Sequence, residues 1–217
     1  MAYIKKPERI TDRSFEIIDA EIKRDFPDFQ FQNDLEERII KRAIHTSADF
    51  DYLHNLVFDR QGAQVIQDVI RSGGHLITDT TMAQSGINKR ILKELGTETH
   101  CFIRDPRAYQ IAEDKGITRS MAAIELAAQL EGPKVFVVGN APTAIYKILE
   151  MIDAGRLQAE AVVGVPVGFV GAAESKQALH DYPIPSIAAL GRKGGSNVAA
   201  AIINAIQYDI KDTIYQN

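Results

Sequence analysis

The chain has 217 residues, of which 45% are hydrophobic and 25% are charged, a composition typical of a folded globular protein. Its net charge is −4 and no run of Lys or Arg stands out, which argues against nucleic acid as a partner. The single cysteine, Cys101, excludes an internal disulfide and fits a reducing cytosol. We therefore expect one domain over residues 1–217.

The N-terminal segment MAYIKKPERITDRS carries charges and a proline where a signal peptide needs an apolar core. No apolar run in the sequence approaches the roughly 20 residues that are needed to span a bilayer. From these two observations we expect a cytoplasmic protein with no membrane partner.

Two amphipathic helices are predicted near the N-terminus. Residues 11–26 carry apolar side chains at helical spacing, with Thr11 as a candidate N-cap. Residues 33–45 begin at Asn33, and Glu36 follows three residues later, which resembles a capping box.

From there on, short apolar runs alternate with longer amphipathic segments. The strand candidates are residues 52–58, 75–79, 100–103, 134–138, 161–165 and 186–190. The helix candidates are residues 61–71, 86–95, 106–115, 119–130, 142–154, 172–180 and 196–209. Repeated strand–helix–strand units favour parallel pairing, because the crossover returns the chain to the same end of the sheet. The pattern predicts a doubly wound α/β fold, with a mostly parallel sheet, helices on both faces and two N-terminal helices.

Distinctive residues follow the predicted strands, at the edge where open parallel sheets bind ligands. The segments are DTTM (79–82), RDPR (104–107), GNAPTA (139–144), PVGFVGAAESK (166–176) and GRKGGSN (191–197). Gly139 alone could simply allow a tight turn. The glycines at 191, 194 and 195, together with Arg192, indicate backbone N–H groups at a helix start, where an anionic group is favoured.

Several common sites are missing from the sequence. There is no G-x-G-x-x-G dinucleotide fingerprint, no P-loop and no G-x-S-x-G nucleophile elbow. The five histidines show no H-x-x-x-H spacing, so we expect no bound metal and interpret most of them as packing or surface residues.

The stretch RAIHTSADFDY, residues 42–52, gathers unusual chemistry. Residues three apart share a helix face, so Arg42 and His45 should project side by side. A lone histidine is most often a packing or surface residue, but Arg42 and the carboxylates of Asp49 and Asp51 favour a functional role for His45. The helix C-terminus and a carboxylate would raise the pKa of His45, whereas Arg42 would lower it, and the sequence leaves this balance open.

Taken together, RAIHTSADFDY, RDPR, TRSMAA, GNAPTA, PVGFVGAAESK and GRKGGSN resemble the precorrin-8X methylmutase family of cobalamin (vitamin B12) biosynthesis, in order and over nearly the whole chain. The version HTSADFDY is similar to members that act on the cobalt-containing intermediate. The resemblance implies an isomerase that moves a methyl group from C-11 to C-12 of (cobalt-)precorrin-8, without an added cofactor, to give cobyrinate or hydrogenobyrinate. It also implies a homodimer with the site near the subunit interface.

The resemblance assigns roles to particular residues. His45 matches the family histidine that is proposed to protonate a ring nitrogen beside the migrating centre. The expected contacts to the substrate are Ser14, Arg42, Thr118, Arg119, Ser120, Arg192, Gly194, Gly195 and Ser196. Lys193 departs from some relatives, which carry an apolar residue there. A corrinoid with several carboxylates fits local positive groups on an acidic protein, and Arg104 and Arg107 are further candidates.

The sequence also allows two other functions. One is a tetrapyrrole carrier on the same fold that binds the ligand without converting it. The other is an enzyme that binds a nucleotide or S-adenosylmethionine, against which the missing glycine fingerprint argues.

Overall fold

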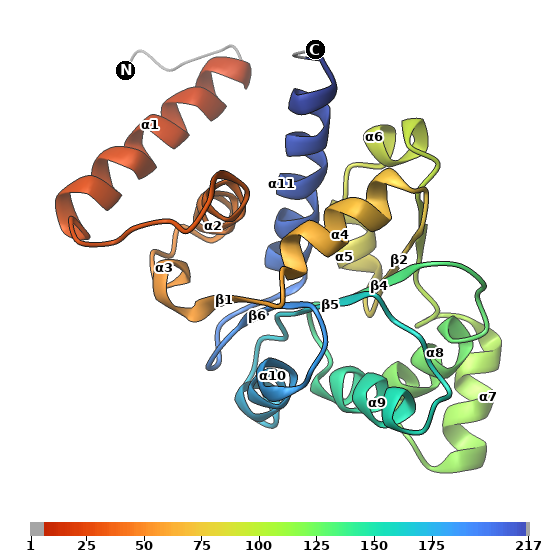
Figure 1. The fold of residues 1–217 in the computed structure, drawn as a ribbon. Helices are drawn as coiled ribbons and strands as arrows, with labels where there is room; N and C mark the ends of the chain where they lie inside the picture. Colours follow the sequence, from red (N-terminus) through yellow and green to blue (C-terminus); the bar gives the residue numbers. More distant parts are fainter. Residues whose placement is uncertain (1–6, 216–217) are drawn as a thin grey trace.

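The computed structural model describes the backbone of residues 7–215 and the side chains of residues 9–213. Residues 1–6, the start of the segment inspected above for a targeting signal, and 216–217 lie outside the described part. One mixed sheet runs through the centre, and helices cover both of its faces (Figure 1). The predicted doubly wound α/β class is confirmed.

The strands are β1 (Leu56–Asp59), β2 (His75–Thr78), β3 (Glu98–His100), β4 (Lys134–Val138), β5 (Ala161–Gly164) and β6 (Ser186–Ala189). The helices on one side of the sheet are α1 (Pro7–Asp25), α2 (Asp34–Ser47), α4 (Gly62–Arg71), α5 (Thr81–Gly86), α6 (Lys89–Glu94) and α11 (Ser196–Tyr215). Those on the other side are α7 (Pro106–Lys115), α8 (Arg119–Ala127), α9 (Pro142–Asp153) and α10 (Ala172–Asp181). The short α3 (Tyr52–Asn55) leads into β1.

The strand order is β1-β6-β5-β4-β2-β3. All neighbouring strands are parallel except β1, which is antiparallel to β6 at the edge of the sheet. From β2 the chain winds to β3 on one side and to β4, β5 and β6 on the other, which places the topological switch point between β2 and β4. Helices bury both faces of β4, so the residues VFVV that follow Lys134 read as one apolar run rather than as an alternating pattern.

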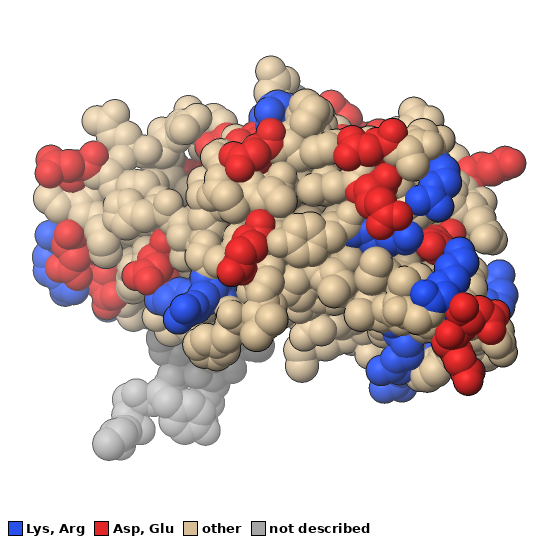
Figure 2. All heavy atoms as spheres, turned by 90° about the horizontal axis from the view of Figure 1, so that it is seen from below, with Lys and Arg blue, Asp and Glu red and all other residues tan. Residues whose placement is uncertain are grey.

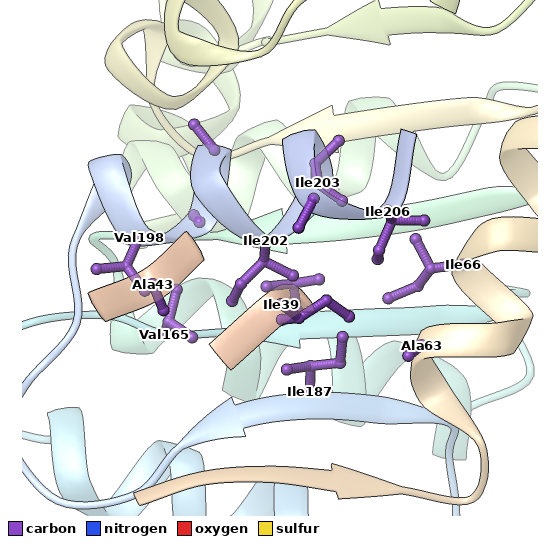
Figure 3. Close-up of a cluster of buried hydrophobic side chains, with 14 of the residues drawn as sticks. Ile39, Ala43, Ala63, Ile66, Val165, Ile187, Val198, Ile202, Ile203 and Ile206 are labelled. Carbon is purple, nitrogen blue, oxygen red and sulfur yellow. The ribbon is translucent and has the colours of Figure 1, made fainter. Parts of the chain in front are cut away.

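The larger core lies between the sheet and the layer of α2, α4 and α11. Figure 3 shows the labelled side chains of this core converging from α2 (Ile39, Ala43), α4 (Ala63, Ile66), the strand region (Val165, Ile187) and α11 (Val198, Ile202, Ile203, Ile206). The apolar side of α11, which was predicted as an amphipathic helix over residues 196–209, is therefore buried, and it fixes α2 beside α11 above the carboxyl edge of the sheet.

Some predicted boundaries are wrong. Residues 52–55 form a helical turn, α3, because the Asn55 N–H bonds back to the carbonyl of Asp51, and only residues 56–59 join the sheet. The helix predicted over 86–95 begins only at Lys89, as α6, because the Asn88 side chain caps it there. The preceding α5 was not predicted. The third strand lies two residues earlier than predicted.

The caps of the N-terminal helices differ in outcome. The Asn33 side chain accepts the Glu36 N–H at 3.0 Å, so the predicted N-cap of α2 is confirmed. Thr11 is not an N-cap, because α1 already begins at Pro7. Proline suits a first helical turn, since the N–H it lacks would have no partner within the helix there.

Seen from the side of α9 and α10, acidic and basic side chains are interspersed and form no continuous basic patch on that face (Figure 2). Within the described part of the chain, no helix combines the length and the apolar character that crossing a membrane requires.

Candidate active site

The antiparallel direction of β1 decides where the end of α2 lies. Leu56, which begins β1, pairs with Ala189, which ends β6, so the chain just before β1 lies at the carboxyl edge of the parallel strands. That preceding segment includes the last turn of α2 and the turn over residues 48–51. The reversal therefore brings residues 42–51 to the edge where open α/β sheets bind ligands.

His45 lies in the last turn of α2 with an exposed side chain. Its imidazole stacks on the Phe15 ring of α1, with the ring centroids 5.2 Å apart and the ring planes at 11°. Among the residues that the structure describes, neither ring nitrogen has a hydrogen-bond partner. Phe15 therefore supports the face of the imidazole, while both ring nitrogens remain available for hydrogen bonds. This arrangement suits proton exchange with a bound ligand.

The pKa of His45 lies below its ordinary value because of partial burial and the neighbouring Arg42 guanidinium. Asp49 and Asp51 do not oppose this effect: each accepts a contact of 2.6 Å from the Lys193 ammonium. The balance that the sequence left open is therefore decided, in the free protein, in favour of a lowered pKa. With a pKa below 6.5, the imidazole is mainly neutral at pH 7.

Lys193 joins the turn after α2 to the loop that precedes α11. Its two ion pairs raise the pKa of its ammonium group, and the Asp51 N–H also donates to Asp49 at 3.0 Å. The sequence left the role of Lys193 open. The structure shows a positioning contact that holds the segment after His45 against the glycine loop.

Arg42 lies between two aromatic rings. Its guanidinium carbon is 4.8 Å from the centroid of Phe15 and 5.2 Å from that of Tyr208. No carboxylate among the described residues pairs with it, whereas Arg38, one turn earlier, bonds Asp212 at 2.7 Å. The charge of Arg42 is thus held in place by packing and remains open to an anionic ligand.

A hollow of about 260 Å³ opens beside His45, between α2 and α11. Its lining residues are Arg42, His45, Thr46, Gly86, Asn197, Ala200, Ala201, Asn204 and Tyr208. A second hollow of about 220 Å³ lies across Arg42 and Tyr208 and reaches Phe15. A larger hollow of about 650 Å³, around the start of α2, is lined by none of the predicted site residues. Arg42 and Tyr208 therefore form the wall that the two hollows at the site share.

Close backbone contacts shape the loop of residues 191–195. Gly194 has a φ of 153°, and a Cβ there would lie 2.1 Å from the Val165 carbonyl oxygen, so only glycine fits. The Gly195 N–H donates to the same carbonyl at 2.8 Å. This amide already has a partner, which differs from the anion-binding role that the glycine pattern suggested for it.

Two polar contacts anchor the same loop from within the protein. The ammonium group of Lys176, a fully buried residue of α10, donates to the Lys193 carbonyl at 2.7 Å. Burial lowers the pKa of Lys176 to about 8. The Ser196 hydroxyl is bonded to the Thr80 hydroxyl at 2.7 Å, which joins the start of α11 to that of α5.

Asp79, directly after β2, fills the crevice at the switch point. Its carboxylate accepts the N–H groups of residues 139–141 at 2.7 to 2.9 Å, and burial nevertheless raises its pKa. Gly139 serves a close approach, since a Cβ there would lie 2.7 Å from the Ser196 Cα. These loop amides therefore bind the protein's own carboxylate and act as a scaffold.

The TRS triplet lies at the same edge of the sheet but beneath the opposite face. Thr118 caps α8, and its hydroxyl is 3.0 Å from that of Thr143, which lies in the first turn of α9 after β4. Arg119 lies over the Tyr109 ring at 4.8 Å and donates to its hydroxyl at 2.7 Å. Ser120 is half-buried beside it. No described contact joins this triplet to His45.

Arg192 and the loop before α10 form an exposed apolar surface. The Arg192 guanidinium lies over the Phe169 ring at 5.5 Å. Phe169 is 83% exposed and Val170 is 91% exposed, so two large apolar side chains of this loop stand open at the carboxyl edge. Such residues usually mark a surface that a ligand or a partner covers.

Four of the predicted arginines fall into two groups. Arg42, Arg119 and Arg192 each lie over an aromatic ring, and none has a carboxylate partner within the described part of the chain. Arg107, by contrast, forms an ion pair of 2.6 Å with Asp105, so its charge is already compensated. Arg107 is therefore a weaker candidate than these three arginines for binding an anionic ligand.

Ser14 precedes Phe15 on α1 and therefore lies close to the stacked His45 ring. Its hydroxyl donates to the Ile10 carbonyl at 2.8 Å, within its own helix. The structure thus brings Ser14 to the His45 region without showing a contact between them.

Sequence reasoning missed several residues at the site. Phe15 is one of the apolar side chains at helical spacing in residues 11–26, a pattern that indicates core packing, yet it supports both His45 and Arg42. Asn197, Asn204 and Tyr208 line the hollow from α11. Their spacing places them on one side of a helix whose first half is largely apolar, and that pattern was the available signal.

The fold and site define a doubly wound α/β protein in which an open imidazole and unpaired arginines meet at the carboxyl edge of the sheet. This arrangement suits acid–base chemistry on an anionic small molecule. Comparison with known proteins identifies the class further: a family model described as Precorrin-8X methylmutase matches residues 9–208.

Individual relatives agree with this match. The cobalt-precorrin-8 methylmutase of Salmonella typhimurium is 52% identical, over 98% of this chain and all of its own length. That of Methanocaldococcus jannaschii is 37% identical over 91% of each chain. The crystal structure of precorrin-8x methyl mutase from Thermus thermophilus covers 94% of this chain and 98% of its own, at 31% identity and a TM-score of 0.83. The chain belongs to the precorrin-8X methylmutase family, whose members are isomerases that catalyse an intramolecular methyl migration.

Proposed function

We propose that this protein converts cobalt-precorrin-8 to cobyrinate by moving a methyl group from C-11 to C-12 of the macrocycle. One observation supports this assignment above others: His45, with both ring nitrogens open, stands beside the unpaired Arg42 at the carboxyl edge of the sheet. The cobalt form is favoured because the relatives of 52% and 37% identity are both named as cobalt-precorrin-8 methylmutases.

In the proposed mechanism, His45 delivers a proton to a ring nitrogen beside the migrating centre. The added proton draws electron density from the conjugated system, which eases migration of the methyl group, and the proton then returns to the imidazole. General acid catalysis of this kind contributes typically about 10² to 10⁴-fold in rate. The remainder comes from holding the substrate in a reactive geometry.

The neutral resting state of His45 is compatible with this role. Arg42 lowers its pKa in the free protein. A bound substrate carboxylate that pairs with Arg42 would offset that cation and raise the pKa of the imidazole. Substrate binding would thereby charge the proton donor where it is needed.

The substrate's acidic rim would be held by positive and polar groups along the edge. We assign this role to Arg42, Arg119 and Arg192, each supported by an aromatic ring. A hydrogen bond to a charged group contributes roughly 1.5 to 3 kcal/mol. The remaining proposed contacts are Ser14, Thr118, Ser120, Gly194, Gly195 and Ser196.

We further propose that the protein works as a homodimer in the cytoplasm and that residues 1–217 form a single domain. The hollow beside His45, about 260 Å³, is small against the roughly 300 to 1,000 Å³ of typical ligand pockets. A second copy near the site would enlarge it and cover exposed apolar side chains such as Phe169.

The test is an absorption assay with a molar excess of cobalt-precorrin-8 or of its metal-free counterpart. A mutase converts the excess substrate, whereas a carrier gives only a stoichiometric spectral shift, and that result would reject the proposal.

We expect His45→Ala to abolish turnover and to retain most ligand binding. His180→Ala is a matched control, because His180 pairs with Asp59 at the opposite edge of the sheet. Substantial turnover by His45→Ala would remove His45 from the proton-transfer role.

A further inference from the structure

Three potential metal ligands meet at the edge of the sheet opposite to His45. His75 begins β2, and Glu98 and His100 are the first and last residues of β3. Glu98 and His100 are two apart on one strand, so they project from the same face of the sheet. In the register of the parallel pair, His75 lies directly opposite Glu98. The three side chains therefore converge because of strand pairing, which no spacing within one segment reveals.

The distances between the ligand atoms fit one small cation. His75 Nδ1 is 3.0 Å from His100 Nε2, which is 3.4 Å from a Glu98 carboxylate oxygen. That oxygen is 4.0 Å from His75 Nδ1. For zinc bonds of about 2.0 to 2.2 Å in tetrahedral geometry, neighbouring ligand atoms lie roughly 3.3 to 3.6 Å apart. The observed triangle has edges close to this range.

A hydrogen bond on the far side of the His75 ring fixes its orientation. Its Nε2 lies 2.9 Å from the Glu131 carbonyl oxygen. A carbonyl can only accept, so Nε2 carries the hydrogen and the lone pair of Nδ1 points at His100. A histidine whose other ring nitrogen donates to a backbone carbonyl is the usual outer-shell arrangement of metal sites.

The alternative is a metal-free pair in which His100 Nε2–H donates to His75 Nδ1. That hydrogen bond accounts for the 3.0 Å contact and leaves the Glu98 oxygen 3.4 Å from a nitrogen that already has an acceptor. A divalent cation would take the Nδ1 lone pair of His75 and the Nε2 lone pair of His100, whose hydrogen then sits on its Nδ1, and it would bring in the carboxylate as a third ligand. The two cases differ in their response to added metal.

We propose that His75, Glu98 and His100 form a binding site for Zn²⁺ or a chemically similar divalent cation. Two imidazole nitrogens and one carboxylate are a donor set that Zn²⁺ prefers, with the fourth position left to water. Glu98 is 66% exposed at its side chain, so an ion can enter from solvent. The sequence predicted no metal because no local spacing of ligands is present, whereas these ligands come from two strands.

The site would act as a clamp on the edge of the sheet. β3 has three residues and pairs only with β2, so few backbone contacts hold it. An ion between His75 and the two residues of β3 would tie the two paired strands together. Its location opposite to His45 separates this role from methyl migration.

The experiment uses the full chain without an affinity tag, stripped with a chelator and titrated with ZnCl₂ in a calorimeter. We expect one Zn²⁺ per chain and a rise in melting temperature with added zinc. Loss of an outer-shell partner already weakens metal sites about 10- to 100-fold, so loss of a direct ligand in His100→Gln should weaken binding at least about 100-fold.

Glu98→Gln is the second test variant, because this exposed side chain can be exchanged without disturbing the fold. His180→Gln is the control and should bind zinc like the wild type. The proposal is overturned if the wild type shows no saturable site, or if His100→Gln and Glu98→Gln bind zinc as tightly as the wild type does.

Discussion

The imidazole of His45 and the phenyl ring of Phe15 lie nearly parallel, with centroids 5.2 Å apart and planes at 11°. Phe15 also lies 4.8 Å beneath the Arg42 guanidinium. One side chain of α1 therefore orients both the proposed proton donor and the proposed anchor for a carboxylate. This makes α1 part of the site rather than an accessory to the core.

Phe15→Leu should lower kcat/KM, because leucine keeps the apolar contact but removes the flat surface that orients the imidazole. Aromatic contacts are worth about 0.5 to 1.5 kcal/mol beyond their buried area, which corresponds to roughly two- to tenfold in rate. Steady-state kinetics would measure the effect. Phe29→Leu is the matched control, since Phe29 makes edge-to-face contacts with Phe31 and His54 rather than with His45 or Arg42. An unchanged kcat/KM in Phe15→Leu would contradict an orienting role.

The titration of His45 offers a second prediction. Partial burial and Arg42 hold the pKa of the imidazole below 6.5, so an NMR titration of the free protein should show its midpoint on the acid side of that value. Arg42→Gln removes a cation and should move the midpoint upward. Because the protonated ring is the proposed donor, kcat/KM should fall as the pH rises through the same midpoint. A midpoint above 6.5 in the wild type would contradict this account.

Arg42 itself is predicted to act mainly in binding. Arg42→Gln should raise KM by roughly 10- to 100-fold, which corresponds to the loss of one charged hydrogen bond of about 1.5 to 3 kcal/mol. The effect on kcat should be smaller. Arg38→Gln is the control on the same helix, because Arg38 is already paired with Asp212 and Asp209. Equal effects of the two substitutions on KM would show that Arg42 contributes only through general charge.

The sequence predicted the architecture well because the signals were local. Buried parallel strands such as β4 read as continuous apolar runs, and Asn33 marked its helix start. Boundaries failed where a side chain outside the periodic pattern decided them, as Asn88 does by capping α6. The antiparallel direction of β1 was not predicted either, since nothing in residues 56–59 indicates which neighbouring strand they pair with.

For the site, the same difference between local and distant contacts applies. His45 and Arg42 were found together because helical spacing makes them neighbours. The ion pairs of Lys193 with Asp49 and Asp51 join segments more than a hundred residues apart. The sequence therefore could not decide in which direction the pKa of His45 is shifted. The amides of the glycine loop were expected to face a ligand, but packing directs that of Gly195 to a carbonyl.

Lys176 allows a test of the loop that carries Arg192. Burial lowers its pKa from 10.5 to about 8 while its ammonium group bonds the Lys193 carbonyl. Between pH 8 and 10.5 the unfolded chain keeps this proton and the folded chain does not, so the folded state gains stability as the pH rises. Relative to Lys176→Met, the free energy of unfolding of the wild type should therefore increase across this range, by at most about 3 kcal/mol.

Urea unfolding at several pH values would measure that difference. Lys147→Met is the control, because burial lowers the pKa of Lys147 but hydrogen bonds to Glu125 and Glu150 raise it above its ordinary value overall. For a lysine with a raised pKa, the stabilisation is lost as the pH rises towards the folded value, so the sign is opposite. If the difference between the wild type and Lys176→Met stays flat from pH 8 to 10.5, Lys176 is not held in the apolar setting that the structure shows. The loop before α11 would then need another anchor.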